Sequence, residues 1–308
     1  MRILFCTGNE KMDAEAWRSA VASALPEAEV EIWAPGAAPA DYALVWNPPA
    51  QLFEEQTGLK AVFNLGAGVD ALLKMNIPAH VPITRIEDAG MGALMSEYVV
   101  QAVIRHYRYL DDDEKSMRAG GWDQFRHEPR DNFPVGVMGL GTLGQQVARA
   151  LAFFGFPVNG WSRSPKDIQG VKSFAGNERF NGFLAASRVL VNVLPLTPQT
   201  ENIINRNTLS SLLPDACLIN VGRGAHVVED DLLDCLDSGR LAAAVLDVYR
   251  TEPLPAAHPF RKHPKITLTS HLSAFTTKEE TVRQLTEKIR AAARGEHIPG
   301  TVDRGRGY

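Results

Sequence analysis

Hydrophobic positions along the chain fall into short apolar runs that alternate with segments of helical period. Runs such as Arg2 to Cys6, Tyr42 to Trp46 and Ala61 to Leu65 have the length and composition of buried strands. Between them, Ala14 to Leu25 repeats apolar residues at the spacing of one helix face. Strands that alternate with helices predict a largely parallel sheet covered on both faces, so the pattern indicates an α/β fold.

A long helix is predicted in the middle of the first half of the chain. It extends from about Ser96, a suitable N-cap, to Met117, and Gly120 and Gly121 follow its end. The next segment, Trp122 to Asn132, is polar and contains a proline, which predicts a surface loop.

A second alternating series follows this loop. Strands are predicted at residues 133–139, 157–162, 189–195, 217–222, 241–249 and 266–271. A helix is predicted from Glu229 to Asp237, with Gly239 as its terminator. We therefore expect two domains that divide near residues 97 and 272. Periodicity alone leaves open whether the last segment rejoins the first domain.

Six residues between a predicted strand and a predicted helix have the spacing of a dinucleotide-binding turn. They are Gly139, Leu140, Gly141, Thr142, Leu143 and Gly144. In such a turn the first glycine permits a tight bend, the second lets the backbone approach a pyrophosphate, and the third allows close packing of helix on strand. The amides at the start of the helix then face the anion. Glycines at this spacing also occur as packing devices, but the strand and helix around them favour dinucleotide binding.

The end of the next strand indicates which dinucleotide is bound. An acidic residue for the ribose 2′-hydroxyl is expected about 20 residues beyond the glycines. This chain instead has Ser162, Arg163 and Ser164 there, followed by Lys166. Hydroxyls and a guanidinium bind a 2′-phosphate that a carboxylate would repel, so NADPH is favoured over NADH. The other interpretation is an ordinary solvated basic turn.

Composition and charge limit the classes of partner. The chain has 308 residues and a formal net charge of -4, which argues against a general binder of nucleic acid or membrane surfaces. No apolar stretch approaches the ~20 residues of a bilayer-spanning helix, and the N-terminal run is too short for a signal peptide. Cys6, Cys217 and Cys235 lie in apolar runs at unrelated spacings, so we expect buried thiols and a cytoplasmic protein.

Three side chains near predicted strand ends suit chemistry on a 2-keto acid. Arg223 lies between two glycines and could bind a carboxylate through paired hydrogen bonds. His271 ends a strand and could donate a proton to a carbonyl oxygen, and Glu252 could hold the imidazole in its charged form. Taken singly, each residue is also compatible with an ordinary structural or surface role. The histidines lack metal-ligand spacing, so no metal site is expected.

The ordered motifs of the chain resemble the D-isomer-specific 2-hydroxyacid dehydrogenases. The glycine turn, Gly222-Arg223-Gly224, the segment from Asp247 to Glu252-Pro253-Leu254-Pro255, and Ser270-His271 stand in the order of that family, and the resemblance covers essentially the whole chain. Within the family the chain looks most like the glyoxylate/hydroxypyruvate reductase A branch. The segments that carry this likeness are Tyr42 to Pro49, Leu65 to Asp70, Trp161 to Ser164 and Val302 to Tyr308.

The resemblance implies two α/β domains with the active site in a cleft between them. Residues 97–272 would form a Rossmann-type NAD(P)-binding domain, and residues 1–96 with 273–308 a flavodoxin-like substrate-binding domain. Arg223 would orient the substrate, His271 would be the acid/base and Glu252 its partner. The cofactor would be held by residues 139–144, Ser162, Arg163, Ser164, Leu194, Pro195, Val221, Gly222 and Asp247. The substrate would be held by Trp46, Leu65, Gly66, Ala67, Gly68 and Arg223.

The activity implied is the NADPH-dependent reduction of glyoxylate and hydroxypyruvate to glycolate and D-glycerate, in a homodimer. Two alternatives stay open at this point. One is an NAD-linked dehydrogenase of another small acid, of the lactate or phosphoglycerate type. The other is a dinucleotide-sensing binding protein with little turnover. Formate dehydrogenases, which resemble this family, pair the histidine with glutamine, and Glu252 argues against that assignment.

Overall fold

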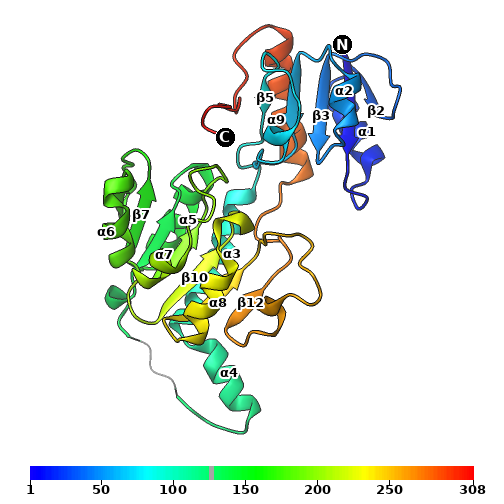
Figure 1. The fold of residues 1–308 in the computed structure, drawn as a ribbon. Helices are drawn as coiled ribbons and strands as arrows, with labels where there is room; N and C mark the ends of the chain where they lie inside the picture. Colours follow the sequence, from blue (N-terminus) through cyan, green and yellow to red (C-terminus); the bar gives the residue numbers. More distant parts are fainter. Residues whose placement is uncertain (125–127) are drawn as a thin grey trace. The chain divides into compact units, whose positions relative to one another are not determined.

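The computed structural model describes residues 1–124 and 128–308, and these divide into two compact units. The first unit combines two separate segments, Met1–Gly90 and Thr276–Tyr308, and the second is the continuous segment Met91–Phe275. The last segment of the chain therefore rejoins the first unit, a point that periodicity left open. Figure 1 shows both units as α/β folds built around one sheet each.

The first unit contains a five-stranded parallel sheet in the order β2-β1-β3-β4-β5. Its strands are β1 (Arg2–Thr7), β2 (Glu29–Ile32), β3 (Tyr42–Trp46), β4 (Ala61–Asn64) and β5 (Ile83–Thr84). Its helices are α1 (Ala14–Ala24), α2 (Gln51–Glu55), the 3₁₀ turn η1 (Leu72–Lys74) and α9 (Lys278–Ala293). This strand order is the flavodoxin-like order of a doubly wound sheet.

Alternation along β1 explains how this sheet is covered on both faces. Leu4 and Cys6 join the buried cluster that also holds Leu52 and Phe53 of α2. Phe5 points to the opposite face, where its ring stacks on Trp17 of α1 with the ring centroids 6.3 Å apart. Helix α9 packs against α1, which ties the C-terminal segment to the first unit.

The second unit contains a seven-stranded parallel sheet in the order β12-β11-β10-β9-β6-β7-β8. Its strands are β6 (Val135–Met138), β7 (Val158–Ser162), β8 (Val171–Ala175), β9 (Val189–Asn192), β10 (Ala216–Asn220), β11 (Leu241–Leu246) and β12 (Ile266–Leu268). Its α-helices are α3 (Met91–Tyr107), α4 (Leu110–Arg118), α5 (Thr142–Phe153), α6 (Phe180–Ala185), α7 (Arg206–Ser210) and α8 (Glu229–Asp237). The chain first runs outward through β6, β7 and β8, then returns to β9 and runs outward the other way. The expected Rossmann-type order is confirmed.

Both faces of this sheet carry an apolar core, because alternate residues of its central strands point to opposite sides. Val189 and Val191 of β9 belong to the cluster formed with α3 and α5, whereas Leu190 belongs to the cluster formed with α6 and α8. Cys217 and Leu218 of β10 divide in the same way. Each layer of helices is thus held by one half of the strand side chains.

The predicted helix from Ser96 to Met117 differs from the structure in two ways. Helix α3 begins earlier, at Met91, so Ser96 is no N-cap and its hydroxyl donates back to the Gly92 carbonyl oxygen at 2.6 Å. The helix then breaks before α4 because Tyr109 adopts a left-handed conformation, with φ of 54°. The apolar period continues through this break, so periodicity alone did not reveal it.

Three strands of the structure were not predicted, and the predicted ends of three others lie too late in the chain. Strands β2, β5 and β8 lie at the edges of their sheets; β2 and β8 lack a continuous buried run, and β5 has only two residues. Strands β9, β11 and β12 end at Asn192, Leu246 and Leu268, each three residues before the predicted end. The residues beyond these ends form the loops at the carboxyl edge of the second sheet, where most of the predicted site residues lie.

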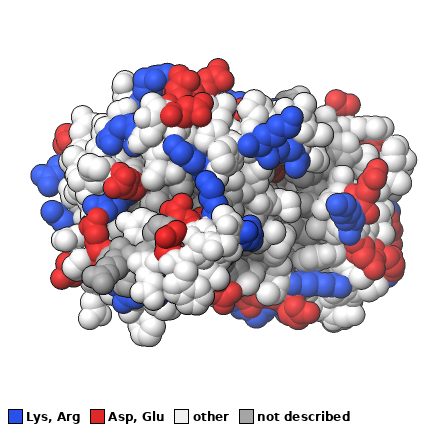
Figure 2. Space-filling view, turned by 90° about the horizontal axis from the view of Figure 1, so that it is seen from below, with Lys and Arg blue, Asp and Glu red and all other residues white. Residues whose placement is uncertain are grey.

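Surface charges of both signs are mixed on the face that Figure 2 shows. Within residues 1–124 and 128–308, no helix has both the length and the apolar character needed to cross a membrane.

Candidate active site

The second sheet has one position at which the connections that follow two neighbouring parallel strands lead to opposite sides of the sheet order. This switch point lies between β6 and β9, which pair in parallel with Val135 opposite Val189. In open α/β sheets, ligands bind outside the carboxyl ends of the strands at such a point. The loops that follow β6 and β9 here are the glycine turn and the segment that contains Leu194 and Pro195.

The glycine turn has the geometry that its three glycines predict. Gly139 adopts φ of +98°, which a side chain would strain. A Cβ atom on Gly144 would lie 1.8 Å from the Gly139 carbonyl oxygen, so only glycine fits there. A Cβ on Gly141, in contrast, would have no atom within 4 Å among the described residues. Gly141 is the N-cap of α5, so open space lies beside the start of a 12-residue helix.

The residues predicted to bind a 2′-phosphate lie at the end of β7. Ser162 is the last residue of that strand, and its hydroxyl donates to the Ser164 carbonyl oxygen at 2.8 Å. Ser162 is half-buried, whereas Arg163 and Ser164 are exposed. The strand order places this end next to β6, from which the glycine turn emerges.

His271 and Glu252 form a direct pair. The imidazole Nδ1 lies 2.8 Å from Glu252 Oε2, and the other carboxylate oxygen accepts the amide of Tyr249 at 2.9 Å. Both side chains are partly open to solvent, with 45% of His271 and 36% of Glu252 exposed. Because Glu252 holds Nδ1, the ring nitrogen able to donate a proton to a ligand is Nε2.

A buried carboxylate holds the main chain on which His271 is carried. His271 has φ of 56°, a left-handed conformation that is uncommon for a residue with a side chain. Its amide donates to the main-chain oxygen of Asp247 at 2.8 Å, and the amides of Leu272 and Ser273 donate to the Asp247 carboxylate at 2.9 Å each. Thr269 donates its hydroxyl to the same carboxylate at 2.5 Å. Asp247 therefore fixes the turn that presents His271, and the cofactor contact predicted for it stays a prediction.

Hydrogen bonds keep both acids of this group ionised. Burial raises the pKa of Glu252, but the His271 hydrogen bond, the Tyr249 amide and the charges of His271 and Arg223 outweigh it, so the pKa lies below its ordinary value. Burial likewise raises the pKa of Asp247, and the hydrogen bonds from Thr269, Leu272 and Ser273 lower it by more. Both groups are carboxylates at neutral pH.

Arg223 follows β10 at the same edge of the sheet. Its side chain is half-buried, and Nη1 donates to the Gly222 carbonyl oxygen at 2.7 Å. Gly224 is required beside it, because a Cβ there would lie 1.8 Å from the Tyr249 main-chain carbon. The charge of Arg223 lowers the pKa of Glu252, so the two residues share one electrostatic environment.

Sequence reasoning missed two buried asparagines that join the loops after β9 and β10. Asn192 and Asn220 are fully buried, and Nδ2 of Asn192 donates to Oδ1 of Asn220 at 2.9 Å. Asn192 accepts the Leu194 amide, and Asn220 accepts the Gly222 amide, both at 3.2 Å. Each asparagine ends an apolar strand, and a polar residue at that position was the signal that could have revealed them.

The substrate-binding residues predicted in the first unit follow β3 and β4. Trp46 ends β3 and covers Gly66, where a Cβ atom would lie 2.3 Å from Cζ3 of the indole. Asn64 Nδ2 donates to the carbonyl oxygens of Gly66 and Gly68 at 2.9 and 2.7 Å, which fixes the turn. Leu65 and Gly66 are buried, whereas Ala67 and Gly68 are half-buried.

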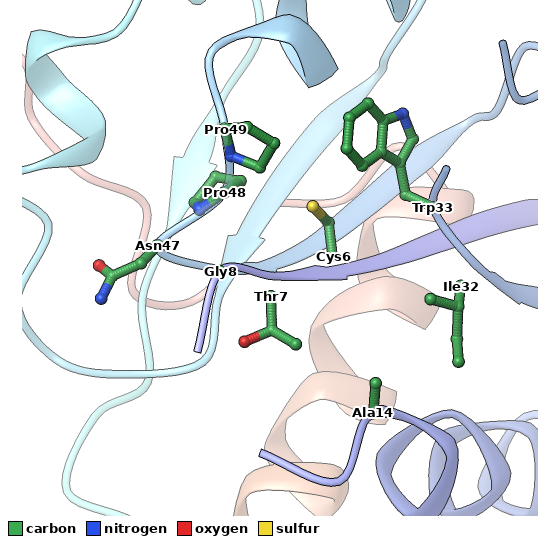
Figure 3. A pocket seen from close by; sticks show the side chains of 9 residues that line it. All are labelled: Cys6, Thr7, Gly8, Ala14, Ile32, Trp33, Asn47, Pro48 and Pro49. Atoms are coloured by element: carbon green, nitrogen blue, oxygen red, sulfur yellow. The ribbon is translucent and has the colours of Figure 1, made fainter. Parts of the chain in front are cut away.

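The first unit also has a hollow of about 400 Å³ at the ends of β1, β2 and β3. Figure 3 shows its lining, in which Asn47 points away from Cys6 and Trp33. Most of the lining is apolar, and it includes none of the predicted site residues. Among the residues that the structure describes, no cluster of three or more His, Cys, Asp or Glu side chains suits a metal ion.

Comparison with known proteins gives one consistent family. Residues 100–273 match the model of the D-isomer specific 2-hydroxyacid dehydrogenase, NAD binding domain. The chain is 46% identical over 303 residues to a glyoxylate/hydroxypyruvate reductase A of Serratia proteamaculans, covering 96% of this chain and 97% of that one. It is 45% identical to the protein of the same name from Escherichia fergusonii, and both chains are covered completely.

Solved structures agree with these relatives. A D-isomer specific 2-hydroxyacid dehydrogenase from Xanthobacter autotrophicus Py2, in complex with NADPH and MES, has a TM-score of 0.94 and 39% identity, and covers 100% of this chain and 99% of that one. An NADPH-dependent glyoxylate/hydroxypyruvate reductase from Sinorhizobium meliloti, in complex with NADP and sulfate, has a TM-score of 0.92 and 34% identity at the same coverage.

Proposed function

Because the chain belongs to the D-isomer-specific 2-hydroxyacid dehydrogenase family, we propose that it is an oxidoreductase that reduces glyoxylate and hydroxypyruvate with NADPH. The products would be glycolate and D-glycerate. The observation that carries this proposal is the pairing of His271 Nδ1 with Glu252 Oε2 at 2.8 Å, on the sheet edge that also carries Arg223 and the glycine turn. A proton donor, an anion-binding cation and a dinucleotide turn are the parts that this reaction needs.

The residues of the second unit suit NADPH. The open space at Gly141 leaves room for a pyrophosphate at the start of α5, where main-chain amides and the helix dipole favour an anion. Exposed Arg163 and Ser164 provide a cation and a hydroxyl for the 2′-phosphate at the end of β7. Residues 194, 195, 221, 222 and 247 complete the proposed cofactor set.

The proposed mechanism assigns one task to each side chain. NADPH, when bound, supplies the hydride. Arg223 binds the carboxylate of the 2-keto acid and orients its carbonyl group. His271 donates the proton on Nε2 to the carbonyl oxygen, and Glu252 holds the ring by Nδ1 and stabilises its charged form.

The substrate pocket proposed in the first unit favours small acids. Trp46 covers Gly66, and residues 65–68 form a turn whose carbonyl oxygens are held by Asn64. We propose that amides of this turn bind the substrate carboxylate and that the indole limits the length of the acid. We therefore expect the substrates to be acids of two or three carbons.

A substrate panel tests this function. Purified protein is given glyoxylate, hydroxypyruvate, pyruvate and phosphohydroxypyruvate, each with NADPH and with NADH, and the loss of absorbance at 340 nm is measured. The proposal predicts that the first two acids with NADPH give the highest kcat/KM. Preference for pyruvate or the phosphorylated acid with NADH would favour a lactate or phosphoglycerate type of enzyme. Binding of NADPH without turnover of any acid would favour a sensing protein.

Replacement of Arg163 by Ala tests the cofactor assignment. An exposed ion pair with a doubly charged phosphate contributes about 1–2 kcal/mol, so we expect the KM for NADPH to rise about tenfold while the KM for NADH stays the same. An unchanged KM for NADPH would contradict the role of Arg163.

We further propose that the protein is a cytoplasmic homodimer. Free, buried Cys6, Cys217 and Cys235 suit a reducing compartment. Adjacent Phe153 and Phe154 at the end of α5 are 85% and 42% exposed, which suits contact with another chain. Light scattering coupled to gel filtration should give twice the mass of one chain, and the mass of a single chain would reject the dimer.

A further inference from the structure

A buried histidine lies between two of the loops that the proposed function uses. His226 is fully buried and ends η4 (Gly224–His226), the turn that directly follows Arg223. Its Nδ1 lies 3.2 Å from the Arg223 amide nitrogen and 2.8 Å from Nδ2 of Asn192. Its Nε2 lies 3.2 Å from the Pro195 carbonyl oxygen. One imidazole thus contacts the loops after β9 and β10.

The partners of His226 fix the position of its proton. The Arg223 amide can only donate, so Nδ1 must present its lone pair. The Pro195 carbonyl oxygen can only accept, so Nε2 must carry the hydrogen. Only the neutral Nε2–H tautomer satisfies both contacts. A proton on Nδ1 would oppose the N–H groups of both Arg223 and Asn192.

Asn192 and Asn220 extend the contacts of His226 into a larger buried hydrogen-bond network. Asn192 donates Nδ2 to Oδ1 of Asn220, and Asn220 donates its own Nδ2 to the Arg223 carbonyl oxygen at 3.1 Å. His226 and Asn220 therefore hold the amide and the carbonyl of the same residue. A buried network in which every member is satisfied defines one backbone position sharply.

We propose that His226 is a positioning residue which, as the neutral Nε2–H tautomer, fixes the main chain of Arg223 relative to Pro195. This inference rests on the proposed function, in which Arg223 binds the substrate carboxylate and Pro195 belongs to the cofactor site. His226 acts through these two residues and is itself buried. Its effect through Arg223 is therefore on the binding of the 2-keto acid rather than on proton transfer.

Two variants separate the two ring nitrogens. In His226→Asn the side-chain oxygen lies near the position of Nδ1, so the acceptor for the Arg223 amide is kept. In His226→Gln the amide nitrogen lies near the position of Nε2, so the donor to Pro195 is kept and that acceptor is lost. We expect His226→Gln to raise the KM for glyoxylate about tenfold at nearly constant kcat. In His226→Asn the KM should stay within about threefold of the wild-type value.

His258 offers a matched control in the same unit. Its Nδ1 accepts the Phe260 amide at 3.3 Å and its Nε2 lies 3.3 Å from Glu229. His258→Gln therefore also loses an acceptor for a main-chain amide, but at Phe260 instead of Arg223. This variant should leave the KM for glyoxylate unchanged. If the two His226 variants showed the wild-type KM, or the same increase as each other, the positioning role would be wrong.

The tautomer is tested without any variant. Nitrogen-15 NMR of the wild-type protein at pH 7 should show the His226 Nε2 protonated and Nδ1 unprotonated. A protonated Nδ1 would overturn the inference, even if the His226 variants failed to fold. Wild-type protein that reduces no 2-keto acid would overturn the proposed function together with this role. Normal wild-type turnover with equal KM values in all variants would overturn the positioning role alone.

Discussion

At the scale of single residues, the site is a set of groups whose partners fix their chemical form. Glu252 accepts from His271 and from the Tyr249 amide, and its pKa lies below the ordinary value although burial opposes this. It is therefore a carboxylate throughout the neutral range. In the proposed reaction its charge stabilises the protonated imidazole that reduction requires.

Replacement of Glu252 by Gln keeps an acceptor for the imidazole and removes the charge. We expect kcat/KM for glyoxylate at pH 7 to fall about tenfold, because the carboxylate no longer stabilises the positive charge of the imidazole that donates the proton. Glu229→Gln, beside His258 at 3.3 Å, is the matched control and should leave kcat/KM unchanged. An unchanged kcat/KM in Glu252→Gln would contradict the pairing.

At the scale of elements, the sequence predicts strands of the sheet centre well and their ends poorly. Buried runs such as Tyr42–Trp46 were found because they are continuously apolar. The edge strands β2 and β8 were missed because their half-exposed residues carry no such pattern, and β5 was missed because it has only two residues. Arg223 and His271 were nevertheless singled out, because a polar residue just past a buried strand lies at the sheet edge, and their roles in the reaction stay predictions.

The turns themselves could not be read from the sequence. Asn192, Asn220 and His226 stabilise main-chain positions through contacts between segments distant in the chain. Such contacts depend on the strand order, and the strand order is set by crossover connections rather than by local pattern. Their roles followed only from the three-dimensional structure.

The loop after β4 depends on the absence of a side chain at residue 66. In Gly66→Ala the new Cβ would lie 2.3 Å from Cζ3 of Trp46, so the indole must move. We expect a loss of about 1–3 kcal/mol of unfolding free energy and a higher KM for glyoxylate. Gly58→Ala is the control, because its Cβ would have nothing within 4 Å among the described residues. If the two variants had the same unfolding free energy in urea titration and the same KM, the proposal that the Trp46 indole bounds the substrate pocket beside Gly66 would be wrong.

The turn after β12 depends on the Asp247 carboxylate. Replacement by Asn removes acceptors from buried donors and should cost about 2 kcal/mol of unfolding free energy at pH 7. Because the folded-state pKa of Asp247 is lowered, its contribution is complete above the ordinary pKa and is lost as pH falls through the folded-state value. The difference between wild type and Asp247→Asn should therefore shrink below about pH 4. Urea titrations giving the same difference at every pH would contradict this account.

At the scale of the whole molecule, the chain forms one unit from two separate segments and a second unit from a single continuous segment. The first needs both ends of the chain, whereas the second is one segment, Met91–Phe275. The two apolar clusters on either side of the second sheet lie entirely within that segment. A domain with its own core can in principle fold alone.

The isolated segment 91–275 should therefore fold cooperatively. We expect it to bind NADPH with a Kd within about tenfold of the value for the whole chain, and to lose reduction of glyoxylate because it lacks Trp46 and residues 65–68. Circular dichroism and fluorescence titration measure the first two quantities. A segment that folds but does not bind NADPH would contradict the assignment of the cofactor site to this unit.

The most direct test of the central claim is the kcat of His271→Asn for glyoxylate reduction with saturating NADPH. A general acid contributes about 10²–10⁴-fold to the rate, so we expect a loss of that size while the affinity for NADPH stays near the wild-type value. A variant that retained more than about one tenth of the wild-type kcat would show that His271 is not the proton donor.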